Sequence, residues 1–470
     1  MSAQMVETNG RTVGGTEHSW CRAVPGGTGI AVLAILTSEA PKFSHLQTAL
    51  QKLQKAHPIL KSRLVSNPNT DTFSFLTSPT PFVQIKFFDL SSTYQILQKY
   101  YTNPTNETVS PFQLILEHEL NQNCWQNPSR PSSTTSDMFF ATTYVLPNTK
   151  CVVVFRLHVS ACDRTTAASL LRELLMLMEE EGAGSNGGVQ KEIVNKGKVS
   201  LGIEDLIPNG KAKNPLWARG VNMLSYSVNS LGLTNLKFKD SKSPRSSNVV
   251  RLQLDQNDTE TVLAGCKTRG IKLCGAVTAA GLLAVHSTKP KRSSKKYGTV
   301  TLTDCRSVLD PPLSTHNFGF YHSAILNIHE IKGGESFWEL AKKTYGTFAN
   351  SKNSNKHFTD MADLNFLMVK AIDNPGLTSS SSLRTSIMSV FEDPVIDLSS
   401  EKQKEIGLED YMGCASIHGV GPSIAIFDTI RDGRLDCVCV YPTPLHSREQ
   451  MQELVDNMKA IIVEAGNVHG

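Results

Sequence analysis

Continuous apolar runs alternate with stretches of helically spaced apolar residues along the whole chain. The runs at 29–36 and 151–158 predict buried strands, because a short apolar run bounded by polar residues is typical of a strand covered on both faces. Apolar residues repeat at helical spacing over 43–57, where Pro58 ends the helix, and again over 165–181. Strands and helices that alternate in this way predict an α/β protein.

The remainder of the first half is expected to be rich in strands. Residues 17–28 predict a turn that leads into the buried strand, and 92–106 predict a short helix followed by a loop. The further predicted strands of this half are 73–77, 82–90, 112–120 and 138–146.

The second half repeats this mixture of elements. A strand at 248–255 precedes two helices within 258–287, which a Gly-bounded turn separates, and 317–331 predict a turn that enters a strand. Near the end, Asp432 and Gly433 predict the turn between two strands, and a helix follows them.

The chain has 470 residues, which is too long for one typical core and suggests two domains of roughly 200 residues each. Residues 182–215 are rich in Gly, Asn and Lys and predict a linker. We therefore expect one domain over 1–181, a linker or crossover over 182–215, and a second domain over 216–470.

Composition excludes several classes of protein. A net charge of +4 is too weak for this length to indicate nucleic-acid binding. The 10 cysteines are scattered and form no C-x-x-C pair, so structural zinc is not expected and no metal site is predicted. We expect buried, reduced thiols in a reducing compartment.

Targeting and membrane signals are not evident. The N-terminus is polar and lacks the basic start and apolar core of a signal peptide. No apolar run approaches the about 18–20 residues that span a bilayer. We therefore expect a cytoplasmic protein, not bound to a membrane, and a monomer. The basic run at 289–296 has three interpretations: a solvated loop, a nuclear-import signal, or a clamp for phosphates.

The segment 151–171 carries the candidate chemistry. The strand predicted at 151–158 ends at His158, and Asp163 follows five residues later, directly before a helix. A histidine at the mouth of a strand, near an acid that fixes the backbone, is how a proton-abstracting base is commonly presented.

This segment resembles the signature of the superfamily of condensation domains and plant acyl-CoA-dependent acyltransferases, whose fold is that of chloramphenicol acetyltransferase. The family pattern is His-His-x-x-x-Asp-Gly, in which the second histidine is the base. With Asp163 on the family's acid, His158 falls on the first histidine, Val159 on the base and Arg164 on the glycine. The chain is therefore a divergent member by this resemblance.

The resemblance covers roughly residues 15–465. It implies two chloramphenicol-acetyltransferase-like subdomains, each with a mixed sheet covered by helices, and a tunnel between them in which the substrates meet. It also implies that Asp163 forms a structural ion pair with an arginine of the other half, for which Arg306 is the expected partner. A competing interpretation is that Asp163 caps the helix that follows it.

The family's second motif, Asp-Phe-Gly-Trp-Gly, aligns with residues 417–421. Gly419 and Gly421 match its glycines, whereas the Asp, Phe and Trp are absent. We expect His418, Gly419 and Gly421 to line the tunnel, with an exposed turn as the alternative for His418.

Each candidate has a structural alternative. His158 is either the base or a histidine packed under the signature loop. Cys162 is either a nucleophile or a buried thiol, and the isolated histidines His316 and His322 are expected to be surface or satisfied core residues.

Three functions follow from the resemblance. The first is transfer of an acyl group from an acyl-CoA donor to a hydroxyl or amine of a small-molecule acceptor, in the setting of plant specialised metabolism and with no bound cofactor. The second is a catalytically silent protein that binds a small molecule or a partner through the same tunnel, which Val159 and Arg164 favour. The third is a different reaction, such as cyclisation or isomerisation, in that tunnel.

Overall fold

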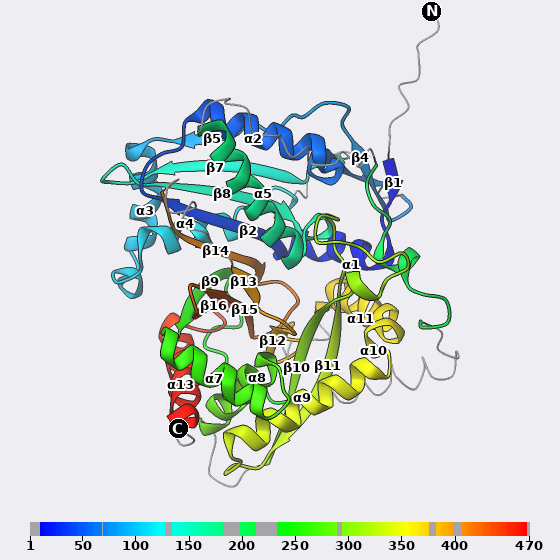
Figure 1. Ribbon diagram of the computed structural model, residues 1–470, viewed down its shortest axis with the longest axis vertical. Helices are drawn as coiled ribbons and strands as arrows, with labels where there is room; N and C mark the ends of the chain where they lie inside the picture. Colours follow the sequence, from blue (N-terminus) through cyan, green and yellow to red (C-terminus); the bar gives the residue numbers. More distant parts are fainter. Residues whose placement is uncertain are drawn as a thin grey trace, which may run out of the picture.

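The computed structural model describes residues 10–67, 69–126, 134–182, 198–212, 233–288, 294–375, 382–397 and 407–467. Within these residues the chain forms two layered halves, and Figure 1 shows the N-terminal half above the C-terminal half. Each half contains a mixed sheet with helices packed on it, so the predicted α/β class is confirmed.

A five-stranded sheet forms the centre of the N-terminal half. Its order is β14 (Leu408–Ile417), β2 (Thr28–Thr37), β8 (Cys151–His158), β7 (Phe139–Val145) and β5 (Ile85–Phe88). The central strands β2 and β8 are buried along nearly their whole length. This burial explains their continuous apolar sequences, because a strand covered on both faces has no solvent side.

Helices cover both faces of this sheet. Helices α2 (Phe43–Ala56) and α5 (Arg164–Gly182) pack their leucines on one face, and α3 (Leu90–Tyr101) and α4 (Pro111–Leu120) pack on the other. Helix α1 (Gly15–Ala23) leads into β2. A separate four-stranded sheet lies beside this layer; its order is β1 (Gly10–Thr12), β4 (Thr72–Thr77), β3 (Ser62–Asn67) and β6 (Thr134–Asp137).

A seven-stranded sheet forms the centre of the C-terminal half. Its order is β11 (His322–Ile331), β10 (Lys295–Asp304), β12 (Met388–Phe391), β15 (Ile424–Arg431), β16 (Arg434–Thr443) and β9 (Ser246–Gln253), with β13 (Val395–Asp397) paired to β15. The helices of this half are α7 (Gln256–Thr268), α8 (Leu273–Ser287), α9 (Phe337–Asn353), α10 (Lys356–Thr359), α11 (Met361–Asp373) and α13 (Arg448–Asn467). Helices α8, α9 and α13 share a core with the sheet.

Two segments of the first half differ from the expectation. Residues 111–120 form helix α4 rather than a strand, because Ser110 caps the first turn and Pro111 stands at the first helical position, where its missing N–H costs nothing. Residues 15–23 form helix α1 rather than a turn, with Glu17 completing the N-terminal turn through the Gly14 amide.

Strand β14 joins the two halves. It belongs to the second half in sequence but pairs with β2 of the first half, as Figure 1 shows. Strands from before and after the predicted linker at 182–215 therefore belong to the same five-stranded sheet. Of that segment, 183–197 and 213–215 lie outside the described residues. The described part contacts both halves, through Glu204 with Thr16 and through the Leu201 carbonyl with Tyr321.

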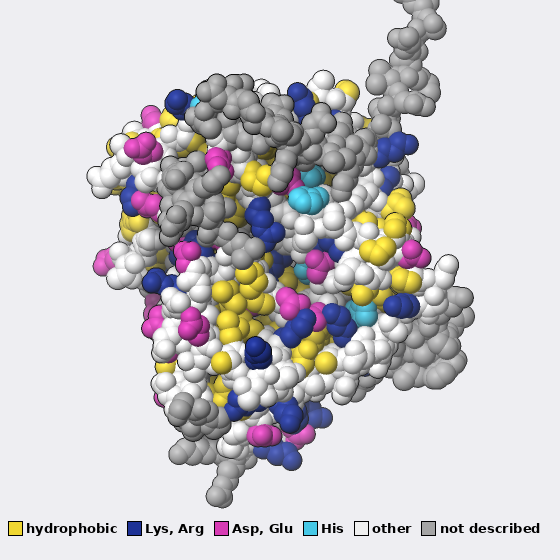
Figure 2. Space-filling view, in the orientation of Figure 1, with side chains coloured by type: hydrophobic (Ala, Val, Ile, Leu, Met, Phe, Trp, Pro, Cys, Tyr) yellow, Lys and Arg dark blue, Asp and Glu magenta, His cyan; other side chains and the backbone are white. Residues whose placement is uncertain are grey.

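Three features named in the sequence analysis concern the surface and the helices: the weak net charge, the lack of a membrane-spanning run and the basic run. On the face drawn in Figure 2, Lys and Arg side chains are interspersed with Asp and Glu among the described residues. No described helix is by itself both long and apolar enough to cross a bilayer; α7 and α8 meet that standard only as a pair, bent by 107° at the break between them. Most of the basic run at 289–296 lies outside the described residues.

Candidate functional site

A large cavity of about 860 Å³ opens between the two halves. Helices α1 and α5 and strands β2 and β8 contribute to its wall from one half, and β10, β11, β12, β15 and α11 contribute from the other. Most of the lining surface is apolar, and polar and charged side chains are interspersed among the leucines, valines and phenylalanines. A cavity of this size and character suits a small organic molecule.

His158 lies outside this lining. Its side chain shares a face of β8 with Val152 and Val154, and its ring is wholly buried against Trp125, with ring centroids 5.2 Å apart. The Nδ1 atom accepts hydrogen bonds from the Ser160 amide and hydroxyl. Burial lowers the pKa of His158 to about 3, so the ring is neutral. This geometry is that of the packed, structural alternative.

We expect His158→Ala to act on stability rather than on turnover. The substitution leaves the Ser160 donors unpaired in a buried site, which should reduce the free energy of unfolding by about 1–3 kcal/mol. Urea denaturation measures this change, and activity per folded molecule should stay at the wild-type level. Loss of all activity with an unchanged unfolding curve would instead make His158 the base.

Contacts from both halves of the protein hold Asp163 in place. Arg306 Nη1 and Nη2 lie 2.8 Å and 3.1 Å from its two carboxylate oxygens, so the predicted ion pair between the halves is present. The Thr166 amide donates to Oδ1 at 2.8 Å, so Asp163 also caps α5. Burial alone would raise the pKa of Asp163, but Arg306 and His322 together lower it well below its usual range.

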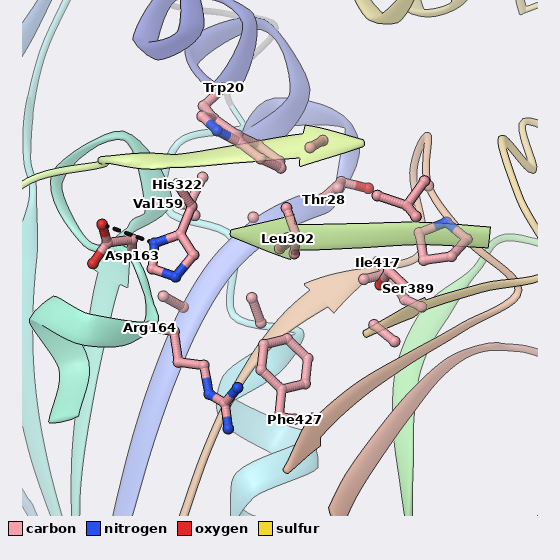
Figure 3. Close-up of a pocket in the computed structure, with 18 of the residues that line it drawn as sticks. Trp20, Thr28, Val159, Asp163, Arg164, Leu302, His322, Ser389, Ile417 and Phe427 are labelled. Atoms are coloured by element: carbon pink, nitrogen blue, oxygen red, sulfur yellow. Dashed lines mark ion pairs between the residues drawn. The ribbon is translucent and has the colours of Figure 1, made fainter. Parts of the chain in front are cut away.

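His322 is the histidine that lines the cavity. It stands at the start of β11, and its Nδ1 atom lies 3.1 Å from Oδ2 of Asp163, the ion pair drawn as a dashed line in Figure 3. The angle of this contact falls short of a regular hydrogen bond. The other ring nitrogen, Nε2, points away from Asp163 in Figure 3 and has no hydrogen-bond partner among the described residues.

Arg164 is the next polar group along the cavity wall. Its guanidinium lies over the Phe391 ring at 4.3 Å, and Nη1 lies 2.9 Å from Oδ1 of the buried Asp428. Burial raises the pKa of Asp428 above its usual value, although Arg164 acts in the opposite direction. The Nη2 atom of Arg164 is buried and has no hydrogen-bond partner in the part of the chain that the structure describes. The side chain that replaces the family's glycine therefore brings an unused donor to the cavity.

Val159 and Cys162 line the same region. The resemblance places Val159 on the family's base. A methyl group of Val159 packs against Gly29 so closely that a Cβ added to Gly29 would lie 2.5 Å from that methyl group. Cys162 is buried, and burial with the nearby Asp163 charge raises the pKa of its thiol. A thiol with a raised pKa is a poor nucleophile, which argues against a covalent role for Cys162.

Of the three residues expected on the tunnel wall, only Gly421 lines the cavity. Gly419 lies behind it, against the Gly26 carbonyl, where an added Cβ would come within 2.5 Å of that oxygen. His418 turns toward Gly27 and lies 3.0 Å from the Ser247 hydroxyl, so it is neither a lining residue nor the exposed turn residue considered as its alternative. Burial, followed by Arg384 and Arg245, lowers the pKa of His418 to about 4.

Within the described residues, no group of three or more His, Cys, Asp or Glu side chains could hold a metal ion. The cysteines in this part of the chain are unpaired thiols, and nearly all of them are buried. The polar chemistry of the cavity therefore rests on single side chains and ion pairs.

Comparison of the whole structure with solved structures finds similar folds over nearly the whole chain. Polyketide synthase associated protein 5 from Mycobacterium tuberculosis is 14% identical with a TM-score of 0.66, covering 98% of this chain and 99% of that one. The trichothecene 15-O-acetyltransferase TRI3 from Fusarium sporotrichioides is 11% identical with a TM-score of 0.66, covering 97% and 95%. The epimerization domain of tyrocidine synthetase B is 10% identical with a TM-score of 0.64, covering 99% and 98%.

The chain has the fold of condensation domains and chloramphenicol-acetyltransferase-like acyltransferases. No protein-family model matches the sequence, and no curated protein matches it. At identities this low the likeness establishes the fold, and the chemistry must be argued from the side chains of this chain.

The sequence alone did not single out His322 or Arg164 as polar groups of the cavity. Residues 158 and 322 end and begin strands in different halves, and only the packing of β11 against the signature loop brings His322 to Asp163. The one available signal was a histidine at the end of a strand: His322 begins the strand predicted after the turn at 317–321, as His158 ends its own strand.

Proposed function

We propose that the protein transfers an acyl group from a coenzyme A thioester to a hydroxyl or amine of a small, largely apolar molecule held in the cavity. The observation that carries this proposal is the pair formed by His322 and Asp163 on the cavity wall. It supplies a candidate base in a chain whose sequence has Val159 where the family's base is expected.

The pair suits a general base. With Nδ1 directed at the Asp163 carboxylate, the proton of a neutral imidazole belongs on Nδ1, and Nε2 is left to accept a proton. Arg306 and the Tyr321 amide keep the carboxylate ionised and in place. The imperfect angle is ordinary for a site without substrate, because such contacts often tighten only when the substrate is bound.

Acyl transfer also requires a hydrogen-bond donor for the oxyanion, and Arg164 can supply one. The carbonyl oxygen of a thioester becomes an oxyanion when it is attacked, and a preplaced donor stabilises that charge. Arg164 lines the cavity, and its buried Nη2 atom has no partner among the described residues, so in this proposal that donor takes up the incoming oxygen. Asp428 balances most of the guanidinium charge, so the donor is held in position without a strong excess charge.

The proposed reaction conserves atoms and charge. The acceptor O–H or N–H gives its proton to His322 Nε2 as its oxygen or nitrogen bonds to the thioester carbon. The tetrahedral oxyanion then collapses, the carbon–sulfur bond breaks, and the imidazolium returns the proton to the departing thiolate. The products are an ester or amide and coenzyme A.

A catalytically silent binder is the second candidate. Val159 favours it, because the position that the resemblance gives to the base is occupied by an apolar side chain that lines the cavity. In that case the same cavity would hold a small molecule, and His322 would be a buried polar residue paired with Asp163.

The deciding experiment is a turnover assay with purified full-length protein. Acetyl-, malonyl-, hexanoyl- and aromatic acyl-CoA donors are each combined with panels of apolar alcohols and amines, and release of coenzyme A thiol is followed. Acceptor-dependent thiol release with a matching ester or amide by mass spectrometry supports acyl transfer. Folded protein that binds the apolar compounds but releases no thiol with any donor would establish the silent binder.

A further inference from the structure

A second polar region of the cavity is built around Arg384. This arginine lines the cavity and is only 5% exposed. Its guanidinium donates hydrogen bonds to the carbonyls of Ser382 (3.2 Å), Ile417 (3.0 Å), Pro422 (2.6 Å) and Gly419. All of these acceptors are neutral, and within the described residues no carboxylate pairs with Arg384. A buried charge without a counter-charge is costly, so its retention calls for a partner.

The guanidinium still has a donor to offer. It carries five N–H groups, and the contacts to Ser382, Ile417, Pro422 and Gly419 use four of them. The remaining N–H therefore belongs to a side chain on the cavity wall and has no acceptor among the described residues.

Thr28 provides an independent observation at the same place. Thr28 lines the cavity, and its buried hydroxyl has no hydrogen-bond partner among the described residues. Both groups lie against Gly419: a Cβ on this glycine would be 2.9 Å from the Thr28 hydroxyl, and its carbonyl accepts from Arg384. In Figure 3, Thr28 and Ile417 lie on the opposite side of the view from His322 and Asp163.

The surroundings of Arg384 are positive. Burial, followed by the charge of Arg245, lowers the pKa of Arg384 to about 9, and burial also lowers the pKa of Arg245. Arg245 donates to the Ser382 carbonyl at 2.7 Å. Burial, followed by the same two arginines, lowers the pKa of the neighbouring His418. An anion placed here would relieve repulsion from both guanidinium groups.

We propose that the Arg384 and Thr28 end of the cavity binds the carboxylate of an organic acid whose apolar body extends along the cavity. The unused N–H of Arg384 and the Thr28 hydroxyl offer two donors, which match the two oxygens of a carboxylate. The remaining wall of the cavity is mostly apolar and accommodates the body of the acid. The acid is the acyl acceptor if the proposed function holds, and a bound ligand if it does not.

The experiment uses decanoate and methyl decanoate as probes and measures their affinities for the full-length protein by isothermal titration calorimetry. We expect decanoate to bind at least about tenfold more tightly, since a hydrogen bond to a charged group contributes about 1.5–3 kcal/mol. Arg384→Gln should weaken decanoate by about 10–100-fold and leave the ester unchanged. Equal affinity of the wild type for acid and ester would overturn the proposal.

Two further variants keep the test decisive. Thr28→Val is nearly isosteric and should weaken decanoate by about 3–10-fold, even if Arg384→Gln fails to fold because its carbonyl contacts are lost. Arg172→Gln is the matched control, because Arg172 also lines the cavity but is exposed. It should change decanoate binding by less than about twofold, since an exposed cation is screened by solvent. An equal loss in the Arg172 and Thr28 variants would contradict the assigned site.

The outcome is separable from that of the proposed function. Preference for the acid together with no thiol release from any acyl-CoA leaves the carboxylate site standing and removes acyl transfer. Thiol release with no preference for acids removes the carboxylate site alone. Tighter binding of decyl phosphate than of decanoate in the wild type would also overturn the assignment to a carboxylate.

Discussion

Replacing His322 with asparagine is expected to lower kcat by about 10²–10⁴-fold, the usual contribution of a general base. An asparagine amide can donate to Asp163 from the place where Nδ1 of the histidine lies 3.1 Å from that carboxylate, but it cannot accept a proton from the acceptor. The ion pair between Asp163 and Arg306 is untouched, so the melting temperature should fall by no more than a few degrees. Steady-state rates and thermal unfolding of the same preparation measure both effects.

A second histidine variant separates a catalytic from a structural role for His322. If His322 is the base, His322→Asn loses the rate per folded molecule, because an amide cannot take the proton from the acceptor. His316→Asn is the matched control, because His316 lies six residues earlier with a side chain 65% exposed and pairs with Glu173 outside the cavity lining. A rate loss of the same size in both variants would remove His322 from the mechanism.

Local sequence patterns predicted the elements that frame the site. The apolar run of β8, the helical spacing of α5 and the Asp-Gly turn between β15 and β16 each carry their own signal, because strand and helix periods follow from burial of one face or both. Helix α4 was missed, since a short apolar run fits a strand and a buried helix equally well until its cap is weighed.

The arrangement of the cavity was predictable only in part. The family resemblance led from Asp163 to Arg306, 143 positions further along the chain, and the ion pair is present. At the position of the family's base this chain has Val159, and the resemblance could not predict which other side chains bring polar groups to the cavity. His322 reaches Asp163 and Arg384 reaches Gly419 through contacts between segments that lie far apart in the sequence, and no spacing in the sequence encodes such contacts.

Asp163→Asn is expected to reduce the free energy of unfolding by about 3–5 kcal/mol. The substitution keeps the size of the side chain but leaves the Arg306 guanidinium buried, 3% exposed, without its main counter-charge. The cap of α5 and the bond from the Tyr321 amide are also weakened. Urea denaturation followed by circular dichroism measures the change. Glu409→Gln removes an exposed pair with Lys150 and should cost less than about 1 kcal/mol.

A double-mutant cycle isolates the pair from the other contacts of Asp163. Arg306→Met alone leaves the carboxylate buried without its arginine partner, so it should be about as damaging as Asp163→Asn. The double variant removes both charges, and its loss should be smaller than the sum of the two single losses by about 0.5–3 kcal/mol, the usual coupling of residues in contact. Strictly additive losses would mean that the two charges do not interact across the halves, and that Asp163 acts as a helix cap alone.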